Sequence, residues 1–357
     1  MKKLVCLLLA LIMALSCVTL TACNDTEDGD GGETRKVTDL AGTEVEIPKT
    51  VEKVIVTWAS GHELVVMLGG AERLQFCLEE LKSSKFEWLQ VIEPEIMSVP
   101  TLERSNLNVE WYLAQSPELI ISSKETEVAQ LREAGLTTVY MPMSTIENLQ
   151  DAITLLGEIL GDEAKTKAQK YNEYFDKSFS DVSAVISQMQ ENELKSTYLL
   201  DAQNSSHAER THGKNTVYIE FLEKGGAKTV FPDLSGVYKD VTAEALLLAN
   251  PEYILIGGMN QKEAYDLLVA REDLSSLDAI KNGKVYRIPQ GAYQFDRTSA
   301  ELAIYPTFVA KTLYPERFAS VDLGATVKSF YKEFFDFELS DSQVSAILAG
   351  DPPPKAN

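Results

Sequence analysis

One local pattern occurs twice in this chain and constrains its architecture more than any other feature. The stretches NVEWYLAQSPELII (residues 108–121) and TAEALLLANPEYILI (residues 242–256) each read as a helix end, a proline and an apolar strand. In each stretch a glutamate, Glu110 or Glu244, lies seven residues before a Pro-Glu pair. The two glutamates are 134 residues apart. A structural unit that recurs at this distance indicates two equivalent parts of one fold.

Apolar strands alternate with helical segments on both sides of one long helical stretch. KVIVTW, ELIIS and TTVYM read as strands that helices separate, and STYLLDA, YILIGG and KVYRIP repeat the pattern later. Between Thr145 and Gln190 the strands stop, and helical spacing continues with a break near Gly161. Near the start, VTDLAGTEVEI alternates around an Ala-Gly turn and predicts a hairpin. Alternation of helices and strands predicts an α/β fold with parallel sheets.

The order of these segments predicts the domain organisation. We expect an N-terminal α/β lobe over residues 37–158, a linking helix over 159–194 and a C-terminal α/β lobe over 195–320. Residues 321–357 are amphipathic and predict a helical extension with a tail. A chain of 357 residues is too long for one ordinary core, which agrees with two lobes.

The N-terminus has the form of a bacterial export signal. A basic MKK precedes the apolar run LVCLLLALIMALSCVTL, and small residues precede Cys23. This cleavage site resembles the lipobox, in which the cysteine is lipidated; an ordinary signal or a membrane helix is the alternative. We expect a signal peptide over residues 1–22 and a flexible acidic tether over 23–36. The mature protein is then anchored by lipid to the outer side of a cell membrane, on the surface or in the periplasm.

Charge and cysteine content exclude several classes of function. The formal net charge of −21 argues against a nucleic-acid partner, because phosphate binding needs a basic face. Cys6 and Cys17 leave with the signal, so Cys77 is the one thiol expected in the folded part. A single cysteine forms neither an internal disulfide nor a cysteine-based zinc site.

Several segments, in order, resemble one family of transport proteins. VTDLAGTEVEIPKTVEKVIV, the two E…P-E…I-I segments, GKNTVYIEFLEKGGAKTVF and GAYQFDRTSAELAIYPTFVAKTLYPERF are similar to ABC-transporter substrate-binding proteins for iron complexes, haem and vitamin B12. The match runs from about residue 36 to 318. The resemblance implies two Rossmann-like lobes bridged by one long helix, with the ligand in the cleft between them. It implies a monomeric receptor without enzymatic activity or cofactor, which hands a small metal chelate to an ABC permease dimer.

The resemblance also gives the repeated glutamates a role. In this family, one surface glutamate on each lobe meets arginines of the two permease subunits, and Glu110 and Glu244 match these by position. Exposed carboxylates that meet basic pockets set register and association rate. The alternative is that each glutamate only occupies a helix N-terminus, where it favours the helix dipole. Both roles are compatible.

Polar and aromatic side chains follow four strands, where ligands bind in open α/β lobes. The loops are residues 58–62, 122–124, 204–215 and 290–301. The candidate ligand-binding residues are Trp58, Ser60, His62, Ser123, His207, Arg210, His212, Lys214, Tyr293, Phe295 and Arg297.

Alternative roles remain open for several of these residues. Trp58 and Phe295 also suit the core, and His207 and His212 also suit a surface loop. Asp296 could pair with Arg297 and hold its loop. Two capping boxes are expected at the loops that lead into helices: Ser60 with Glu63, and Thr298 with Glu301.

Aromatic rings with arginine, lysine and histidine suit a bulky, partly aromatic, anionic iron complex. A ferric siderophore is the first expectation; haem, a corrinoid and an oxyanion such as molybdate are alternatives. A bare metal ion would need His62, His207 and His212 to converge, with Asp296. A surface-anchored hydrolase or reductase and an adhesion lipoprotein are the alternatives from other classes.

Overall fold

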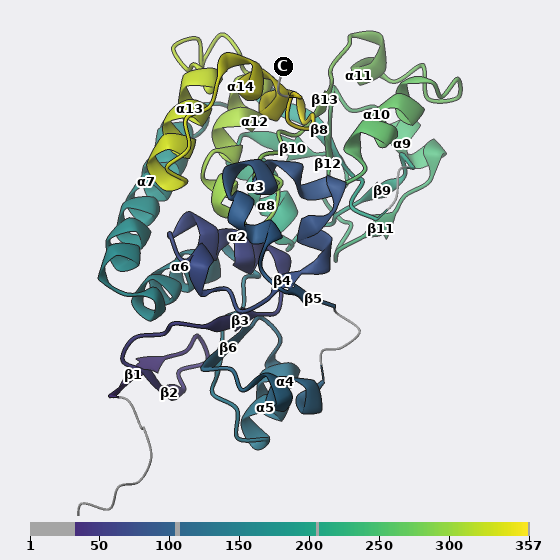
Figure 1. Cartoon of the computed structure of the whole chain (residues 1–357). Coiled ribbons are helices and arrows are strands. Elements are labelled where there is room, and N and C mark those ends of the chain that lie inside the picture. Colours follow the sequence, from purple (N-terminus) through teal and green to yellow (C-terminus); the bar gives the residue numbers. More distant parts are fainter. Residues whose placement is uncertain (1–32, 104–107, 205–206, 356–357) are drawn as a thin grey trace, which may run out of the picture. The chain divides into compact units, whose positions relative to one another are not determined.

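Among the described residues, the two larger parallel β-sheets form the framework (Figure 1). The computed structural model describes residues 33–103, 108–204 and 207–355. The described residues from 34 to 355 belong to one unit. The expected signal peptide and Cys23 lie outside the described residues. Among the described residues, no helix has both the length and the apolar character that crossing a membrane requires.

The N-terminal half is built on a three-stranded parallel sheet in the order β3-β6-β7. The expected hairpin is confirmed, because β1 and β2 pair antiparallel. In its turn, Asp39 Oδ1 accepts hydrogen bonds from the N–H groups of Ala41 and Thr43, each at 2.9 Å. The elements are β1 (Thr34–Thr38), β2 (Glu44–Pro48), β3 (Val54–Val56), α2 (Ala59–Met67), β4 (Cys77–Leu78), α3 (Glu87–Ile92), β5 (Thr101–Leu102), α4 (Val109–Gln115), β6 (Leu119–Ser122), α5 (Glu125–Glu133) and β7 (Thr138–Tyr140).

Two packed helices connect the halves. α6 (Ile146–Leu160) and α7 (Asp162–Ile186) are separated by Gly161, whose φ of 105° suits glycine. The expected long helical stretch and its break are therefore confirmed. One face of α7 is buried through Tyr171 and Phe175. The exact lobe and linker boundaries given above stay predictions.

The C-terminal half holds a four-stranded parallel sheet in the order β10-β8-β12-β13. A short antiparallel pair, β9 with β11, follows the end of β8. The elements are β8 (Lys195–Asp201), β9 (Arg210–Thr211), α8 (Val217–Lys224), β10 (Ala227–Thr229), β11 (Lys239–Asp240), α9 (Ala243–Ala249), β12 (Tyr253–Gly257), α10 (Gln261–Val269), α11 (Asp278–Lys281), β13 (Val285–Arg287), the 3-10 helix η7 (Ala300–Ala303) and α12 (Tyr305–Leu313). The expected α/β class is confirmed.

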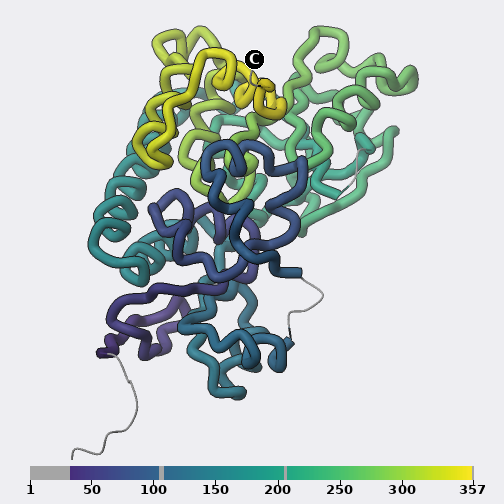
Figure 2. Tube along the Cα trace, in the orientation of Figure 1, coloured from purple at the N-terminus to yellow at the C-terminus, as the bar shows by residue number. Residues whose placement is uncertain are grey.

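The C-terminal extension packs back onto both halves. It consists of α13 (Leu323–Phe334) and α14 (Asp341–Ala349), and the yellow end of the trace runs beside α7 (Figure 2). Phe334 makes edge-to-face contacts with Tyr171 and Tyr174 of α7 at 5.5 and 5.4 Å. Beyond α14, Asp351 accepts a hydrogen bond from Trp88 Nε1 of the N-terminal half and pairs with Arg287 of β13. The extension therefore ties the two halves together.

The repeated pattern forms the same local structure twice. α4 and α9 each have seven residues, and Asn108 and Thr242 cap them by accepting a hydrogen bond from a backbone N–H three residues on. Both helices end in the left-handed conformation, at Ser116 with φ 47° and at Asn250 with φ 38°. Each leads into a fully buried strand, β6 or β12. The two copies therefore occupy equivalent places in the two sheets.

Candidate functional site

A cluster of buried charged side chains lies at the carboxyl end of the C-terminal sheet. Asp201 ends β8, and its Oδ2 accepts hydrogen bonds from His212 Nε2 at 2.8 Å and from Arg297 Nη2 at 2.7 Å. The backbone N–H of Tyr238 donates to His212 Nδ1 at 3.4 Å, so the imidazole carries its proton on Nε2. The predicted residues His212 and Arg297 thus meet at Asp201, which the sequence pattern did not indicate.

Arg297 is the centre of this cluster. Its Nη1 lies 3.2 Å from Asp296 Oδ2, so the ion pair considered from the sequence forms. Its guanidinium carbon lies 4.7 Å from the ring centroid of Tyr218, and that ring stacks on His212 with centroids 4.0 Å apart. Arg297 Nε and Asp296 Oδ1 are buried and have no hydrogen-bond partner among the described residues. Arg297 is therefore held from several sides inside the protein.

Burial and charge act in opposite directions on the two carboxyl groups. Burial alone would raise the pKa of Asp201, but the hydrogen bond from His212 and the charge of Arg297 lower this pKa to about 2. For Asp296, burial dominates and raises the pKa above its usual value, although Arg297 opposes the change. Asp201 is therefore ionised at neutral pH and balances the charge of Arg297. The cluster offers little uncompensated positive charge.

Tyr238 lies beside this cluster on strained backbone. Its φ of 52° falls in the left-handed region, which bulky side chains rarely adopt. Its ring centroid lies 5.2 Å from that of His212 and 5.9 Å from the guanidinium carbon of Arg210. Tyr238 is 37% exposed, whereas His212 is buried. Strained residues gather at functional sites, so Tyr238 is a candidate ligand contact that the sequence pattern missed.

Both capping boxes expected from the sequence are wrong. α2 begins directly after Trp58 without a side-chain cap, and Ser60 lies inside its first turn. Helix η7 also begins without a side-chain cap, so Thr298 does not cap it. Glu63 and Glu301, the expected partners of these caps, are fully buried and interact with each other. A tertiary contact has replaced both local patterns.

The first turn of α2 places one expected residue inside the core. The ring nitrogens of His62 lie 3.0 Å from the carbonyl oxygen of Trp58 and 3.2 Å from that of Phe76. His62 is fully buried, so it suits support of the loop better than direct contact with a ligand. Trp58 is partly exposed, and its Nε1 has no hydrogen-bond partner among the described residues. Ser123, directly after β6, is also partly exposed.

The two aromatic residues expected in the loop before η7 lie in different environments. Tyr293 packs on Phe86 of the N-terminal half with ring centroids 5.4 Å apart, so it lies where the halves meet. Phe295 is fully buried, and the alternative of a core role fits it better than ligand contact. This loop therefore contributes Tyr293 and Arg297 to the candidate site.

The remaining basic residues of the candidate site face carboxylates. Arg210 Nε lies 3.4 Å from Asp240 Oδ1, and Lys214 Nζ lies 3.7 Å from Asp233 Oδ1. His207 and Lys214 are exposed. Within the described parts of the chain, no three His, Cys, Asp or Glu side chains gather as ligands for a metal ion.

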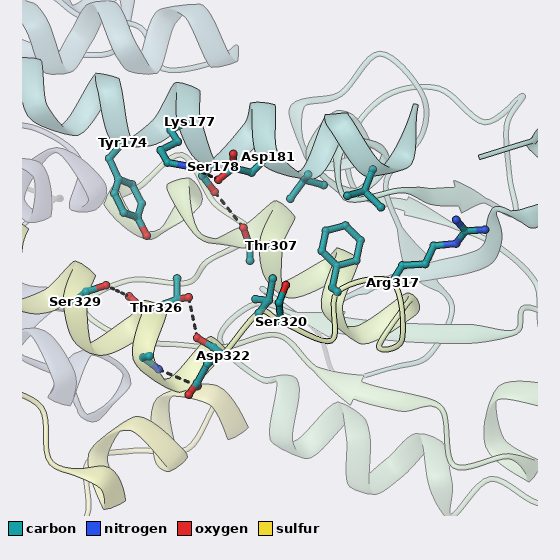
Figure 3. A pocket seen from close by; sticks show the side chains of 15 residues that line it. Tyr174, Lys177, Ser178, Asp181, Thr307, Arg317, Ser320, Asp322, Thr326 and Ser329 are labelled. Atoms are coloured by element: carbon teal, nitrogen blue, oxygen red, sulfur yellow. Dashed lines mark hydrogen bonds and ion pairs between the residues drawn. The ribbon is translucent and has the colours of Figure 1, made fainter. Parts of the chain in front are cut away.

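A separate cavity of about 770 Å³ lies away from these loops (Figure 3). Tyr174 and Ser178 of α7, Thr307 of α12, and the segment that leads into α13 line it. Ser178 and Thr307 hydrogen-bond across its wall at 3.1 Å. Several polar groups drawn in Figure 3 hydrogen-bond to one another, and Lys177 pairs with Asp181. Arg317, which also lines the cavity, pairs with Glu193. The cavity belongs to the packing between the linking helix and the C-terminal extension.

The two repeated glutamates are solvent-exposed. Glu110 and Glu244 are each the second residue of their helix, α4 and α9. Leu113 follows Glu110 by three residues and is 48% exposed; Leu248 follows Glu244 by four and is 89% exposed. Residues three or four apart share a helix face, so each glutamate has an exposed leucine beside it.

Comparison with known proteins gives one consistent family. The family described as periplasmic binding protein matches residues 54–292. The molybdate-binding protein MolA of Haemophilus influenzae is 23% identical over 84% of this chain and 91% of its own length. The iron(3+)-hydroxamate-binding protein YxeB of Bacillus subtilis is 24% identical over 80% of this chain and 89% of its own.

Solved structures of solute-binding proteins have a similar fold. The crystal structure of a periplasmic solute-binding protein from Veillonella parvula superposes with a TM-score of 0.77 at 21% identity, and covers 88% of this chain and 97% of its own. The family match spans both parallel sheets and the long helix between them. The chain therefore belongs to the periplasmic binding protein family, in the class whose members serve ABC transporters as solute-binding receptors.

Proposed function

We propose that this receptor captures an iron complex, a ferric siderophore first of all, outside the cytoplasm and delivers it to an ABC permease. One observation carries the choice of ligand. Each arginine and lysine of the candidate site already faces a carboxylate: Arg297 faces Asp201, Arg210 faces Asp240, and Lys214 faces Asp233. Such a site attracts a bare anion weakly, because the positive charges are compensated.

The partly exposed aromatic residues favour a bulky chelate. Trp58, Tyr238 and Tyr293 present ring surface. Arg210 lies against the ring of Tyr238, and Arg297 lies against that of Tyr218. Flat or apolar ligand surface packs on such rings, and fixed polar groups set its orientation. A ferric hydroxamate of low net charge fits this combination better than the anionic complex expected from the sequence. The hydroxamate-binding relative supports this choice.

A small oxyanion is the second candidate. The N-terminus of α2 has no side-chain cap and no acidic residue in its first turn, and the partly exposed Trp58 precedes it. Helix N-termini bind anions through their free N–H groups and the helix dipole. The molybdate-binding relative supports this alternative. The aromatic surface also suits haem and corrinoids, but no further observation favours either of them.

A panel of thermal unfolding experiments distinguishes these ligands. We expect a ferric trihydroxamate at one hundred times its Kd to stabilise the chain by about 2.7 kcal/mol, which raises Tm by several degrees. Molybdate, haem and cobalamin at the same concentration should leave Tm nearly unchanged. The iron-free hydroxamate is the matched control. A rise in Tm with molybdate alone would replace the iron complex by an oxyanion as the proposed ligand.

Glu110 and Glu244 are proposed to dock the receptor on the two permease subunits. Both are exposed on equivalent helices, and each has an exposed leucine on the same face. A carboxylate beside an apolar side chain resembles the mixed polar and apolar make-up of protein interfaces. We add Leu113 and Leu248 to the proposed docking surface. The permease is expected to present a basic pocket with an apolar edge to each helix.

Lipid attachment at Cys23 is a further part of the proposal, and it rests on the sequence. Cells that grow with a labelled fatty acid should incorporate label into the wild-type chain and not into Cys23→Ala. The physical reason is that the acyl chains are carried by this one cysteine and its amino group, and acyl chains supply the membrane affinity. Equal labelling of both chains would rule out Cys23 as the anchor.

A further inference from the structure

The junction between the halves contains two buried glutamates that neither ligand binding nor docking uses. Glu63 lies in α2 of the N-terminal half and Glu301 in η7 of the C-terminal half, and both are 0% exposed. The backbone N–H of Ala300 donates to both carboxyl oxygens of Glu63, at 3.2 and 3.3 Å. Glu63 therefore fastens one half of the protein to the other.

Glu301 is held in place by the C-terminal half. Its Oε1 accepts hydrogen bonds from the hydroxyl of Tyr331 at 2.6 Å and from the backbone N–H of Tyr293 at 3.0 Å. Tyr171 of the linking helix donates to the carbonyl oxygen of Ala300 at 2.8 Å. Four parts of the chain thus meet here: α2, α7, η7 and α13.

No positive charge balances this pair among the described residues. The titratable side chains that face it are tyrosines, Tyr171 from α7 and Tyr331 from α13, and no hydrogen bond or ion pair of the described chain joins a Lys, Arg or His to either glutamate. Two ionised carboxylates side by side in a buried site repel each other and lose hydration. Holding one proton between them removes most of this repulsion.

Burial and the neighbouring carboxylate act on Glu63 in the same direction. Burial raises the pKa of Glu63 well above its usual 4.5, and the charge of Glu301 raises it further. Burial also raises the pKa of Glu301, but the hydrogen bonds from Tyr331 and Tyr293 oppose this change. Glu63 is therefore the acid of the pair, and Glu301 is the carboxylate.

We propose that Glu63 and Glu301 share one proton and form a pH-sensitive latch between the two lobes. In the latched state the Glu63 hydroxyl donates to a carboxylate oxygen of Glu301. As pH rises, the proton leaves to solvent, both groups become negative, and α2 separates from η7. The lobe junction, and not the individual lobes, loosens.

The pH window follows from the direction of the shift. An unfolded chain releases the Glu63 proton near pH 4.5, whereas the folded chain retains it to a higher pH. The stabilisation by the protonated pair is therefore complete below about pH 4.5 and decreases as pH rises toward the raised value. Loss of one proton on unfolding lowers Tm by roughly 2–4 °C for each pH unit within this window.

Glu63→Gln tests the latch, because its amide copies the protonated carboxyl and cannot ionise. Tm of the full-length wild-type chain and of the variant are measured from pH 5 to pH 9. We expect Tm of the wild type to fall relative to Tm of Glu63→Gln as pH rises, by several degrees over the range. Glu133→Gln, an exposed glutamate at the end of α5, should follow the wild type at every pH.

Hydrogen exchange locates the effect at the junction. At pH 8.5 the peptide that contains Ala300 should exchange faster in the wild type than in Glu63→Gln, and at pH 5.5 the two should exchange alike. If Glu63→Gln does not fold, Glu301→Gln serves in its place, because it also removes one charge of the pair. A constant Tm difference between wild type and variant across the pH range, with equal exchange at Ala300, would overturn the latch.

Discussion

Replacing both Glu110 and Glu244 by alanine is expected to abolish uptake of the solute while solute binding stays intact. The two glutamates are exposed at the N-terminal turns of equivalent helices, so they are free to meet a partner. Each charged hydrogen bond lost from a docking interface costs roughly 1.5–3 kcal/mol, and 1.4 kcal/mol is about a tenfold change in affinity. Losing both therefore weakens docking by at least about a hundredfold.

Uptake of a radiolabelled ferric hydroxamate by cells measures this effect, and calorimetry on the purified variant measures binding. Glu147→Ala is the matched control, because Glu147 is also exposed and also the second residue of a capped helix, α6. It should leave uptake and binding unchanged. Normal uptake by the double variant would show that both glutamates only stabilise the N-termini of their helices. Weaker solute binding would move them into the ligand site.

Arg297→Ala is expected to destabilise the fold and not only to weaken ligand binding. The guanidinium lies between Asp201 and Asp296, and all three side chains are buried. Removing the guanidinium leaves Asp296 without its ion-pair partner and leaves Asp201 with the hydrogen bond from His212, in a site of low polarity. Breaking a buried ion pair in this way costs roughly 3–5 kcal/mol. This corresponds to a fall in Tm of roughly 6–20 °C.

Thermal unfolding of Arg297→Ala and of two further variants separates the effect of the lost charge from the effect of the lost packing. Lys214→Ala removes an exposed lysine from a 3.7 Å ion pair and should change stability by less than about 0.5 kcal/mol. Adding Asp201→Asn and Asp296→Asn to Arg297→Ala should recover part of the lost stability, because the unbalanced carboxylates are gone. If Arg297→Ala changes Tm little but abolishes ligand binding, the conclusion is instead that Arg297 contacts the ligand directly.

The sequence predicted the layout of the fold because its strongest patterns are local. The proline-terminated helices, the buried strands that follow them and the glycine break at Gly161 depend on neighbours a few residues away. The structure reproduces each of these features. Residues 71–102 are different, because they form short helical turns and two-residue strands without periodic spacing. Phe86 of this region nevertheless contacts Tyr293, so part of the lobe junction was beyond prediction.

The candidate site was predicted only in part because its contacts join distant segments. His212 and Arg297 stood out as polar residues in loops after strands, but their meeting at Asp201 depends on the pairing of the sheet. Asp201 is the last residue of β8 and follows its buried apolar run, which is a signal that the interpretation of the sequence overlooked. The sequence signal for Tyr238 is weaker: this residue lies two positions after Gly236. In the structure both residues have a positive φ.

The two false capping boxes show how a local rule fails. Glu63 and Glu301 have the spacing that a capping box requires, yet both are directed to the junction between the lobes. The spacing rule describes helix ends exposed to water, where a glutamate has no better partner. In this protein the two glutamates do have better partners: they form a buried carboxyl pair that accepts hydrogen bonds from Ala300 and Tyr331.

Isothermal titration calorimetry of the purified chain with a ferric trihydroxamate measures the proposed binding itself. We expect saturable binding of one chelate per chain with Kd of about 1 μM or tighter, which is about −8 kcal/mol. The iron-free hydroxamate and molybdate should bind far more weakly. Saturable binding of molybdate with no heat from the ferric chelate would contradict the account, because the charge balance around Arg297 would then not decide the ligand.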